Sequence, residues 1–294
     1  MRAPLSWLRT CATLPEQVDA HTLSDALVSV GLEVETVDVV GADVTGPVVV
    51  GRVLSFVEEP QSNGKTIRWC RVDCGEHNPD GEDARGIVCG ARNFAEGDLV
   101  VVSLPGAVLP GDFAIAARKT YGHVSDGMIC SVTELGLPDD HADGILVLPE
   151  GTVGELAVPL LGLREDVLDI AVTPDRGYCF SIRGLGREAA NALQVEFADP
   201  VDHDVPAESA AGHPVRRDSD ANPLFVAVSV TGIDPTRPTP RWLARRLQLA
   251  GMRPISLAVD ITNHVMLETG QPLHAYDAAK LSGPIAGADH VVEG

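Results

Sequence analysis

The feature that most constrains the fold is a series of short segments rich in Val and Ile between residues 47 and 149. Three of them, 48–57, 67–73 and 98–104, are separated from their neighbours by Gly, Pro, Asp or Asn. Short strands at this spacing are typical of a β-sandwich or a small β-barrel. Because aromatic residues make up only 4% of the chain, the core has to rest on Val, Leu, Ile and Ala.

The first 39 residues have a mixed α/β pattern instead. Thr22 or Ser24 is predicted to cap a short helix, and Gly31 is predicted to end it. Residues 32–37 then alternate between apolar and polar side chains, as a half-buried strand does.

Residues 151–198 return to this α/β pattern. A turn at 173–177 precedes Ser181, which is predicted to cap the next helix. The inner face of that helix consists of apolar residues at helical spacing: Ile182, Leu185, Ala189 and Leu193.

The C-terminal part begins with a polar stretch rich in Pro and Ala, residues 199–222, which we interpret as a linker. Beyond it the sequence predicts a strand at 224–230 and a helix that begins at Pro240 and ends at Gly251. A second short helix is predicted at about 256–268.

The charge balance does not favour a freestanding nucleic-acid-binding protein. The net charge is −20, and residues 40–153 carry 8 Lys and Arg against 17 Asp and Glu. Phosphate neutralisation supplies most of the affinity for unspecific RNA. The chain therefore avoids nucleic acid, uses a local basic patch or relies on a partner for positive charge. The candidate RNA contacts of the β region are Lys65, Arg68, Arg71, Arg118 and Lys119. The alternative is that each of them is a solvated surface charge.

A second group of cations lies on the helix predicted after Pro240. Arg241, Arg245 and Arg246 surround this helix, and Arg241 and Arg245 share one face by their spacing of four residues. They form either a basic patch for phosphate or an ordinary solvated helix face.

The six cysteines include no CxxC pair, which favours reduced thiols in a cytosolic protein. Their spacing and their placement in predicted strands argue against zinc, so we predict no metal site. The N-terminus has no long apolar segment typical of a signal peptide. The apolar region 99–117 is interrupted by Pro and Gly, which excludes a membrane span there.

Four motifs of the β region occur in an order that resembles a known domain. They are VVVGRVLSFVEEP (48–60), CRVDCGE (70–76), GIVCGARNFAEGDLVVVSLPGAVLPG (86–111) and SDGMICS (125–131). Together they resemble the OB-fold tRNA-binding domain of several aminoacyl-tRNA synthetases and of free tRNA-binding proteins. The resemblance implies that Gly127 relieves crowding at a barrel corner and that Met128 packs inside. The first loop departs from the family pattern and keeps only Lys65.

Two further motifs narrow the resemblance. LDIAVTPDRGYCFSIRGLGREAANAL (168–193) and MRPISLAVDITNHVMLETGQPLHAYDAAKLSG (252–283) are similar to segments of the bacterial-type phenylalanyl-tRNA synthetase beta subunit. The order of all these blocks agrees with the N-terminal part of that subunit.

The resemblance implies an α+β multidomain architecture. A small α/β domain, residues 1–39 plus 151–198, is interrupted by an OB-fold β-barrel of residues 40–150. After the linker, residues 223–294 start an α/β editing domain of the B3/B4 type. Because the chain stops at Gly294 before this unit is closed, we expect the last domain to be incomplete.

The same resemblance implies a function. The chain is expected to be part of the ligase that attaches phenylalanine to its tRNA with ATP, in the cytoplasm. Its expected partners are tRNA and the alpha subunit, in an assembly of two alpha and two beta chains. ATP and magnesium are implied for the whole enzyme, whereas this chain is expected to hold no cofactor and to be inactive alone.

His274 is the strongest single candidate for a functional residue, and it lies in the motif QPLHAYD (271–277). The resemblance implies that it lines the editing pocket, where tyrosine wrongly attached to the phenylalanine tRNA is hydrolysed. A pocket shaped for Phe rejects an added hydroxyl poorly, so a second, hydrolytic sieve is useful. Without the resemblance, a structural His whose ring caps the turn near Asp277 is favoured.

Two other functions stay open at this point. One is a noncatalytic, free-standing OB-fold tRNA-binding protein, although such a protein needs neither of the motifs at 168–193 and 252–283. The other is a structural scaffold without RNA contact, which the acidic charge favours.

Overall fold

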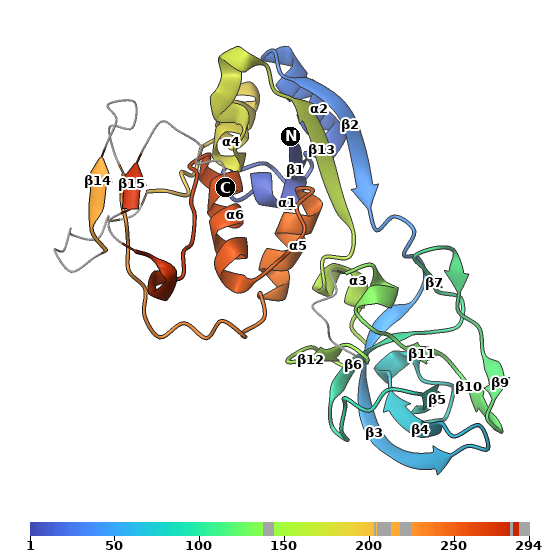
Figure 1. Ribbon diagram of the computed structural model, residues 1–294. Helices are drawn as coiled ribbons and strands as arrows, with labels where there is room; N and C mark the ends of the chain where they lie inside the picture. The colour runs from blue at the N-terminus through green and yellow to red at the C-terminus, as the bar shows by residue number, and fades with distance from the viewer. Residues whose placement is uncertain (138–143, 203, 205–212, 218–224, 283–284, 288–294) are drawn as a thin grey trace.

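The computed structural model describes residues 1–137, 144–202, 204, 213–217, 225–282 and 285–287 (Figure 1). Near the chain start it has a three-stranded antiparallel sheet of order β1-β13-β2. Its strands are β1 (Arg2–Pro4), β13 (Glu165–Ala171) and β2 (Glu33–Val40). Glu165 at the start of β13 lies opposite Val40 at the end of β2, so the chain leaves this sheet and returns to it at neighbouring positions. The predicted domain boundaries themselves stay a prediction.

Helices α1 (Leu5–Leu8), α2 (Ala20–Ser29) and α4 (Ile182–Leu193) pack on this sheet around a buried core that includes Trp7, Leu168 and Ile170. The Ser181 cap of α4 is confirmed, because its Oγ accepts a hydrogen bond from the Gly184 N–H at 3.0 Å.

The cap predicted for α2 was wrong. Neither Thr22 nor Ser24 caps it; Asp19 does, and its Oδ1 accepts from the Thr22 N–H at 2.8 Å. Asp is as good an N-cap as Ser, so the helix begins one turn earlier than predicted. Gly31, at φ 86°, follows its C-terminal end as expected.

The middle of the chain forms a nearly closed, antiparallel β-barrel, which confirms the predicted fold class. The strand order is β11-β6-β3-β4-β5, with β12 also paired to β6. The strands are β3 (Val48–Pro60), β4 (Thr66–Asp73), β5 (Arg85–Cys89), β6 (Leu99–Ser103), β11 (Met128–Ile129) and β12 (Val147–Leu148). Buried Val, Ile and Cys side chains fill the interior, as the scarcity of aromatic residues required.

Smaller elements decorate the barrel. They are β7 (Val108–Leu109), β8 (Phe113–Ala114), β9 (Arg118–Thr120), β10 (His123–Ser125), the 3₁₀ turns η1 (Gly75–His77) and η2 (Thr133–Leu135), and α3 (Ala157–Leu160). The 3₁₀ segment η3 (Pro174–Cys179) leads into α4.

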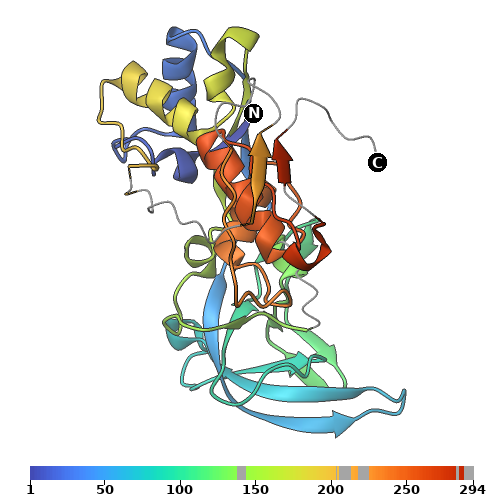
Figure 2. The ribbon, with the colours of Figure 1, turned by 60° about the vertical axis from the view of Figure 1, so that its left-hand side comes forward.

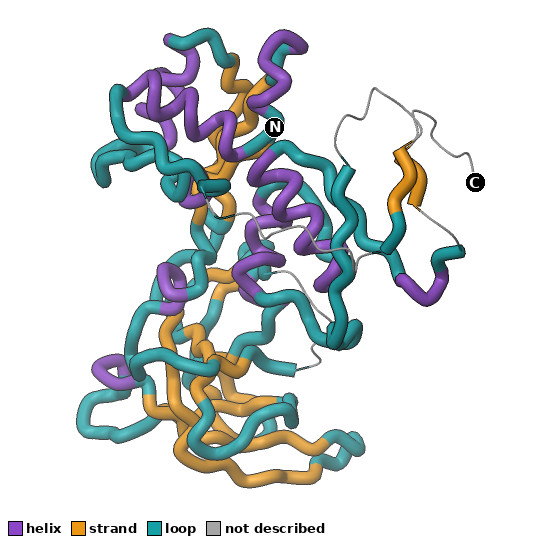
Figure 3. The backbone as a smooth tube through the Cα atoms, turned by 90° about the vertical axis from the view of Figure 1, so that its left-hand side faces the viewer, coloured by secondary structure: helices purple, strands orange, loops and turns teal. Residues whose placement is uncertain are grey.

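The C-terminal part contributes α5 (Arg241–Leu249) and α6 (Leu257–Thr269), close to both predicted helices, with Gly270 left-handed at the end of α6. η4 (Ala278–Lys280) and the parallel pair β14 (Val215–Arg217) and β15 (Ile285–Gly287) belong to the same region. Figures 2 and 3 show α5 and α6 beside the N-terminal helices, above the barrel strands.

The strand predicted at 224–230 was wrong for residues 225–230, which form no strand; residue 224 lies outside the described residues. Val226 and Val228 are 70% and 78% exposed. A β-branched run becomes a strand only when a neighbour pairs with its backbone, and no described segment does so here.

None of the helices in the described part of the chain has the length and apolar character that a membrane span needs.

Candidate nucleic-acid interface

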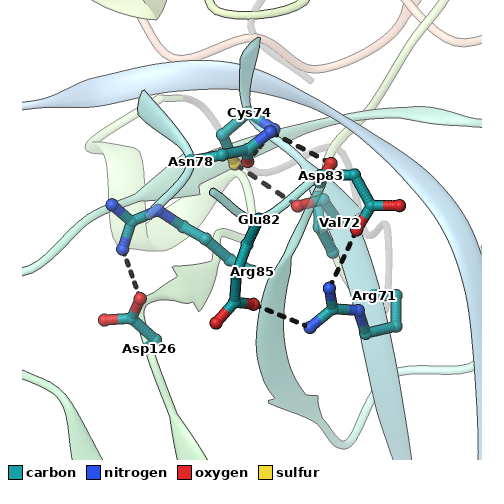
Figure 4. A network of polar contacts seen from close by, with 8 residues as sticks. All are labelled: Arg71, Val72, Cys74, Asn78, Glu82, Asp83, Arg85 and Asp126. Carbon is teal, nitrogen blue, oxygen red and sulfur yellow. Dashed lines mark hydrogen bonds and ion pairs between the residues drawn. The ribbon is translucent and has the colours of Figure 1, made fainter. Parts of the chain in front are cut away.

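The stretch Ser125-Asp126-Gly127 closes the barrel between β5 and β11. The Asp126 N–H donates to the Gly86 carbonyl at 2.8 Å, and the buried Ser125 hydroxyl accepts from the Val88 N–H at 3.0 Å. The Arg85 guanidinium adds an ion pair to the Asp126 carboxylate, which Figure 4 shows. These interactions replace the regular ladder that would join two strands of a fully closed barrel.

Gly127 is needed at this corner. Its φ is 125°, and a Cβ there would lie 3.0 Å from the Ser103 carbonyl oxygen. Any other residue would meet both strain and a crowded backbone. Met128 is half-buried and packs against one of the two apolar clusters of the barrel.

Just before the closure, β9 and β10 form a hairpin, residues 118–125, on the outside of the barrel. Its two-residue turn has positive φ at both positions, 51° at Tyr121 and 86° at Gly122, which is the type I′ geometry that fits the twist of a hairpin. Figure 1 places β9 and β10 at the edge of the barrel near β4 and β5.

An aromatic stack and a polar contact attach this hairpin to the barrel. The His123 ring lies parallel to the Trp69 ring at 4.2 Å between centroids. His123 Nε2 is also 3.0 Å from both carboxylate oxygens of Glu59. Trp69 in turn covers Gly86, where a Cβ would lie 2.2 Å from the ring. Sequence reasoning did not single out Trp69 or His123, because their partners lie on other strands.

Two of the predicted RNA contacts are already paired with carboxylates. Arg68 lies over the Phe56 ring at 4.1 Å from the centroid and forms an ion pair with Glu58. Arg71 forms ion pairs with Glu82 and Asp83, as Figure 4 shows. A cation that neutralises a carboxylate has less charge to offer a phosphate, so these two are the weaker candidates.

The other three candidates have no carboxylate partner among the described residues. Lys65 is exposed in the turn between β3 and β4, and Arg118 and Lys119 are exposed on β9. None of their side chains makes a hydrogen bond or ion pair with another described residue. Arg92, which we did not single out from the sequence, is also exposed, on the loop after β5.

Arg245 and Arg246 of α5 face the protein rather than solvent. An Arg245 Nη donates to the Leu163 carbonyl at 2.9 Å, and burial lowers the pKa of this guanidinium below its ordinary value. Arg246 lies 5.1 Å from the Trp7 ring centroid and 5.5 Å from that of Trp242. Arg241 is exposed. The three arginines therefore do not share one surface, and a phosphate role for them stays a prediction.

His274 lies in an exposed segment after α6. The centroid of its ring is 4.4 Å from that of the Tyr276 ring, and both side chains face solvent. The turn at Asp277 is capped by the Asp277 carboxylate itself, which accepts from the Ala279 N–H. His274 is thus not the cap of this turn, and its role in editing stays a prediction.

A pocket of about 260 Å³ lies where the barrel meets the C-terminal helices. Val132 and Leu137 line it on the barrel side, and Pro235 and Thr239 line it opposite. Asp260 is fully buried at its wall, where its carboxylate accepts from the Thr239 hydroxyl at 2.6 Å and the Ile255 N–H at 2.9 Å. Thr239 precedes α5 and Ile255 follows it, so the Asp260 carboxylate holds the two segments that flank this helix together.

All six cysteines are free and buried. Burial raises the pKa of the Cys70, Cys74 and Cys130 thiols to about 12, so they stay protonated at neutral pH. Among the described side chains, no three His, Cys, Asp or Glu gather closely enough to hold a metal ion.

Two family models match the chain in the order of its folded parts. The model described as "Putative tRNA binding domain" matches residues 48–155, which contain the barrel. The model described as "B3/4 domain" matches residues 221–290, which contain α5 and α6. The fold and these matches define a protein with an OB-type tRNA-binding domain followed by a B3/4 domain.

Similar proteins match almost the whole chain. The phenylalanine–tRNA ligase beta subunit of Thermobifida fusca is 60% identical over 97% of this chain and 34% of its own length. Those of Streptomyces avermitilis and Cutibacterium acnes are 58% and 53% identical, again over 97% of this chain. The chain is thus similar to the N-terminal part of phenylalanine–tRNA ligase beta subunits, and it spans about a third of their length. None of these matches supports a free-standing tRNA-binding protein.

Proposed function

We propose that the chain is the N-terminal part of a phenylalanine–tRNA ligase beta subunit and that its barrel contacts tRNA. The observation that carries this proposal is the 60% identity over 97% of the chain to a subunit with that name. The barrel supports the second part, because its hairpin 118–125 exposes two cations without carboxylate partners among the described residues, on an acidic domain. Phosphate binding needs such unneutralised charge.

The other parts of the proposal concern the whole enzyme. The full protein would act in the cytoplasm as an assembly of two alpha and two beta chains. ATP and magnesium would bind elsewhere in that assembly. His274 would line the editing pocket once further residues complete it.

Residues 1–294 alone are therefore expected neither to charge tRNA with phenylalanine nor to deacylate tRNA mischarged with tyrosine. Incubation of this chain with mischarged tRNA, with the whole enzyme as positive control, checks this. Robust deacylation by the chain alone would contradict it.

The tRNA-binding role is tested by replacing Arg118 and Lys119 with Ala in the full-length beta subunit assembled with its alpha partner. We expect weaker tRNA binding. The slope of log affinity against log salt concentration should become shallower by about 1 for each phosphate that is no longer neutralised. Arg164→Ala, which removes an exposed cation outside the barrel, is the matched control. Unchanged binding by the double variant would leave the hairpin without a role in RNA binding and favour a scaffold.

A further inference from the structure

Tyr121 has an unusual backbone conformation at the tip of the β9–β10 hairpin. Its φ of 51° is in the left-handed region, where a bulky side chain is a genuine outlier. The first position of a type I′ turn is ordinarily taken by Asn, Asp or Gly, which adopt this conformation with little strain. The tyrosine therefore destabilises its own turn.

No polar or aromatic contact within the described residues holds the Tyr121 ring. The Tyr121 side chain is 40% exposed, and it makes neither a hydrogen bond nor a ring contact with another described side chain. A strained residue whose ring and hydroxyl find no such partner within the described fold points to a role toward something outside it.

The hairpin that carries Tyr121 has two cations and no carboxylate, although the barrel as a whole is acidic. Arg118 and Lys119 lie on β9, three and two residues before Tyr121, and they are exposed and without ion pairs in the described structure. Three other arginines of the barrel, Arg68, Arg71 and Arg85, are each paired with carboxylates. The hairpin is thus a place where an acidic domain offers an aromatic ring and free cations together.

The hairpin is also held in place before any ligand binds. The Trp69–His123 stack and the interaction of His123 with Glu59 attach β10 to β4 and β3, and both involve a residue within two positions of Tyr121. A tip fixed in this way presents its ring with little loss of conformational freedom on binding.

We propose that Tyr121 stacks on an unpaired nucleotide of the tRNA while Arg118 and Lys119 bind neighbouring phosphates. This inference rests on the proposed tRNA-binding role of the barrel and assigns its base-binding residue. Aromatic rings bind unpaired bases through their faces with little dependence on sequence, and flanking cations follow the backbone. A helical duplex offers no such exposed face, so the target is a loop or an end.

The test uses substitutions that keep the turn and remove the ring. Tyr121→Gly and Tyr121→Asn relieve the backbone strain, so the full-length enzyme with its alpha subunit should keep or raise its thermal midpoint. We expect their affinity for tRNA to fall by about 5- to 100-fold, with the salt dependence unchanged because the stacking ring is neutral. Tyr121→Phe keeps the ring and should bind as the wild type does. Phe113→Ala, which removes another exposed aromatic ring of the barrel, is the matched control.

The outcomes separate this inference from the proposed function. If Tyr121→Gly binds tRNA like the wild type while the Arg118 and Lys119 double variant is weakened, the barrel binds tRNA but Tyr121 does not stack on it. If both bind like the wild type, the proposed tRNA-binding role of the hairpin is overturned as well. A photocrosslinker in place of Tyr121 gives a second readout: crosslinks to unpaired nucleotides of a loop or an end support the inference, and crosslinks confined to paired stems, or none, overturn it.

Discussion

At the scale of single residues, the close approach of Gly86 and Trp69 decides how the hairpin lies on the barrel. The ring occupies the space of the missing Cβ, with 2.2 Å between them, and its other neighbour is the stacked His123. A glycine in a strand interior commonly marks such a close approach. Only the three-dimensional structure reveals this contact, because Gly86 and Trp69 are 17 residues apart in the sequence.

Gly86→Ala is expected to destabilise the protein by about 1–3 kcal/mol, since Trp69 has to move off the strand. Urea unfolding followed by tryptophan fluorescence measures this. Gly90→Ala is the control, because a Cβ there meets nothing within 4 Å. Equal stability of the two variants would show that Trp69 can shift freely.

Asp199 is a single residue that makes the free energy of unfolding depend on pH. Its carboxylate accepts two hydrogen bonds from Arg183, at 2.7 and 2.6 Å, and these bonds lower its pKa from 3.8 to about 2. A carboxyl group whose pKa is lower in the folded state stabilises the fold above its unfolded pKa, and this stabilisation is lost as the pH falls through the folded value.

Asp199→Asn is therefore expected to reduce the free energy of unfolding at about pH 5, and the difference from the wild type should shrink between about pH 4 and pH 2. Urea titrations at several pH values measure it, with Asp80→Asn on an exposed loop as control. A difference that does not depend on pH would mean that the ion pair is not its cause.

At the scale of elements, α5 and α6 depend on the N-terminal domain for their packing. Trp7 is fully buried and stacks on His264 of α6 at 4.8 Å, and its Nε1 donates to Glu268 at 3.3 Å. Burial lowers the pKa of His264, so its ring favours the neutral form in this stack. The helices thus pack against an aromatic residue from the first helix of the chain.

Trp7→Ala is expected to destabilise the protein by about 3–5 kcal/mol and to raise the hydrogen exchange of α5 and α6 more than that of the barrel strands. Exchange measured by mass spectrometry distinguishes these regions. Trp242→Ala, which removes a ring that is 57% exposed, should have a much smaller effect. Similar exchange in both variants would contradict the packing role of Trp7.

At the scale of the whole molecule, the barrel is an insertion between two paired strands. β2 and β13 lie side by side although the barrel separates them in the sequence. Such an insertion leaves the sheet intact, because its two ends are close together. The net charge of the chain is −20, so a hairpin with two cations that pair with no described carboxylate contrasts with the molecule as a whole.

The sequence by itself determined the elements whose causes are local. The Ser181 cap, the end of α2 at Gly31 and the barrel strands rich in Val and Ile depend on residues a few positions apart, and these were predicted. The tertiary structure alone decided which cations are free and how the barrel closes. Arg68, Arg71 and Arg245 find partners that a linear reading does not place beside them. Residues 225–230 have strand composition but no described neighbour to pair with. The physical reason is that hydrogen bonding and charge pairing act between neighbours in space, and distant parts of a chain become neighbours only when it folds.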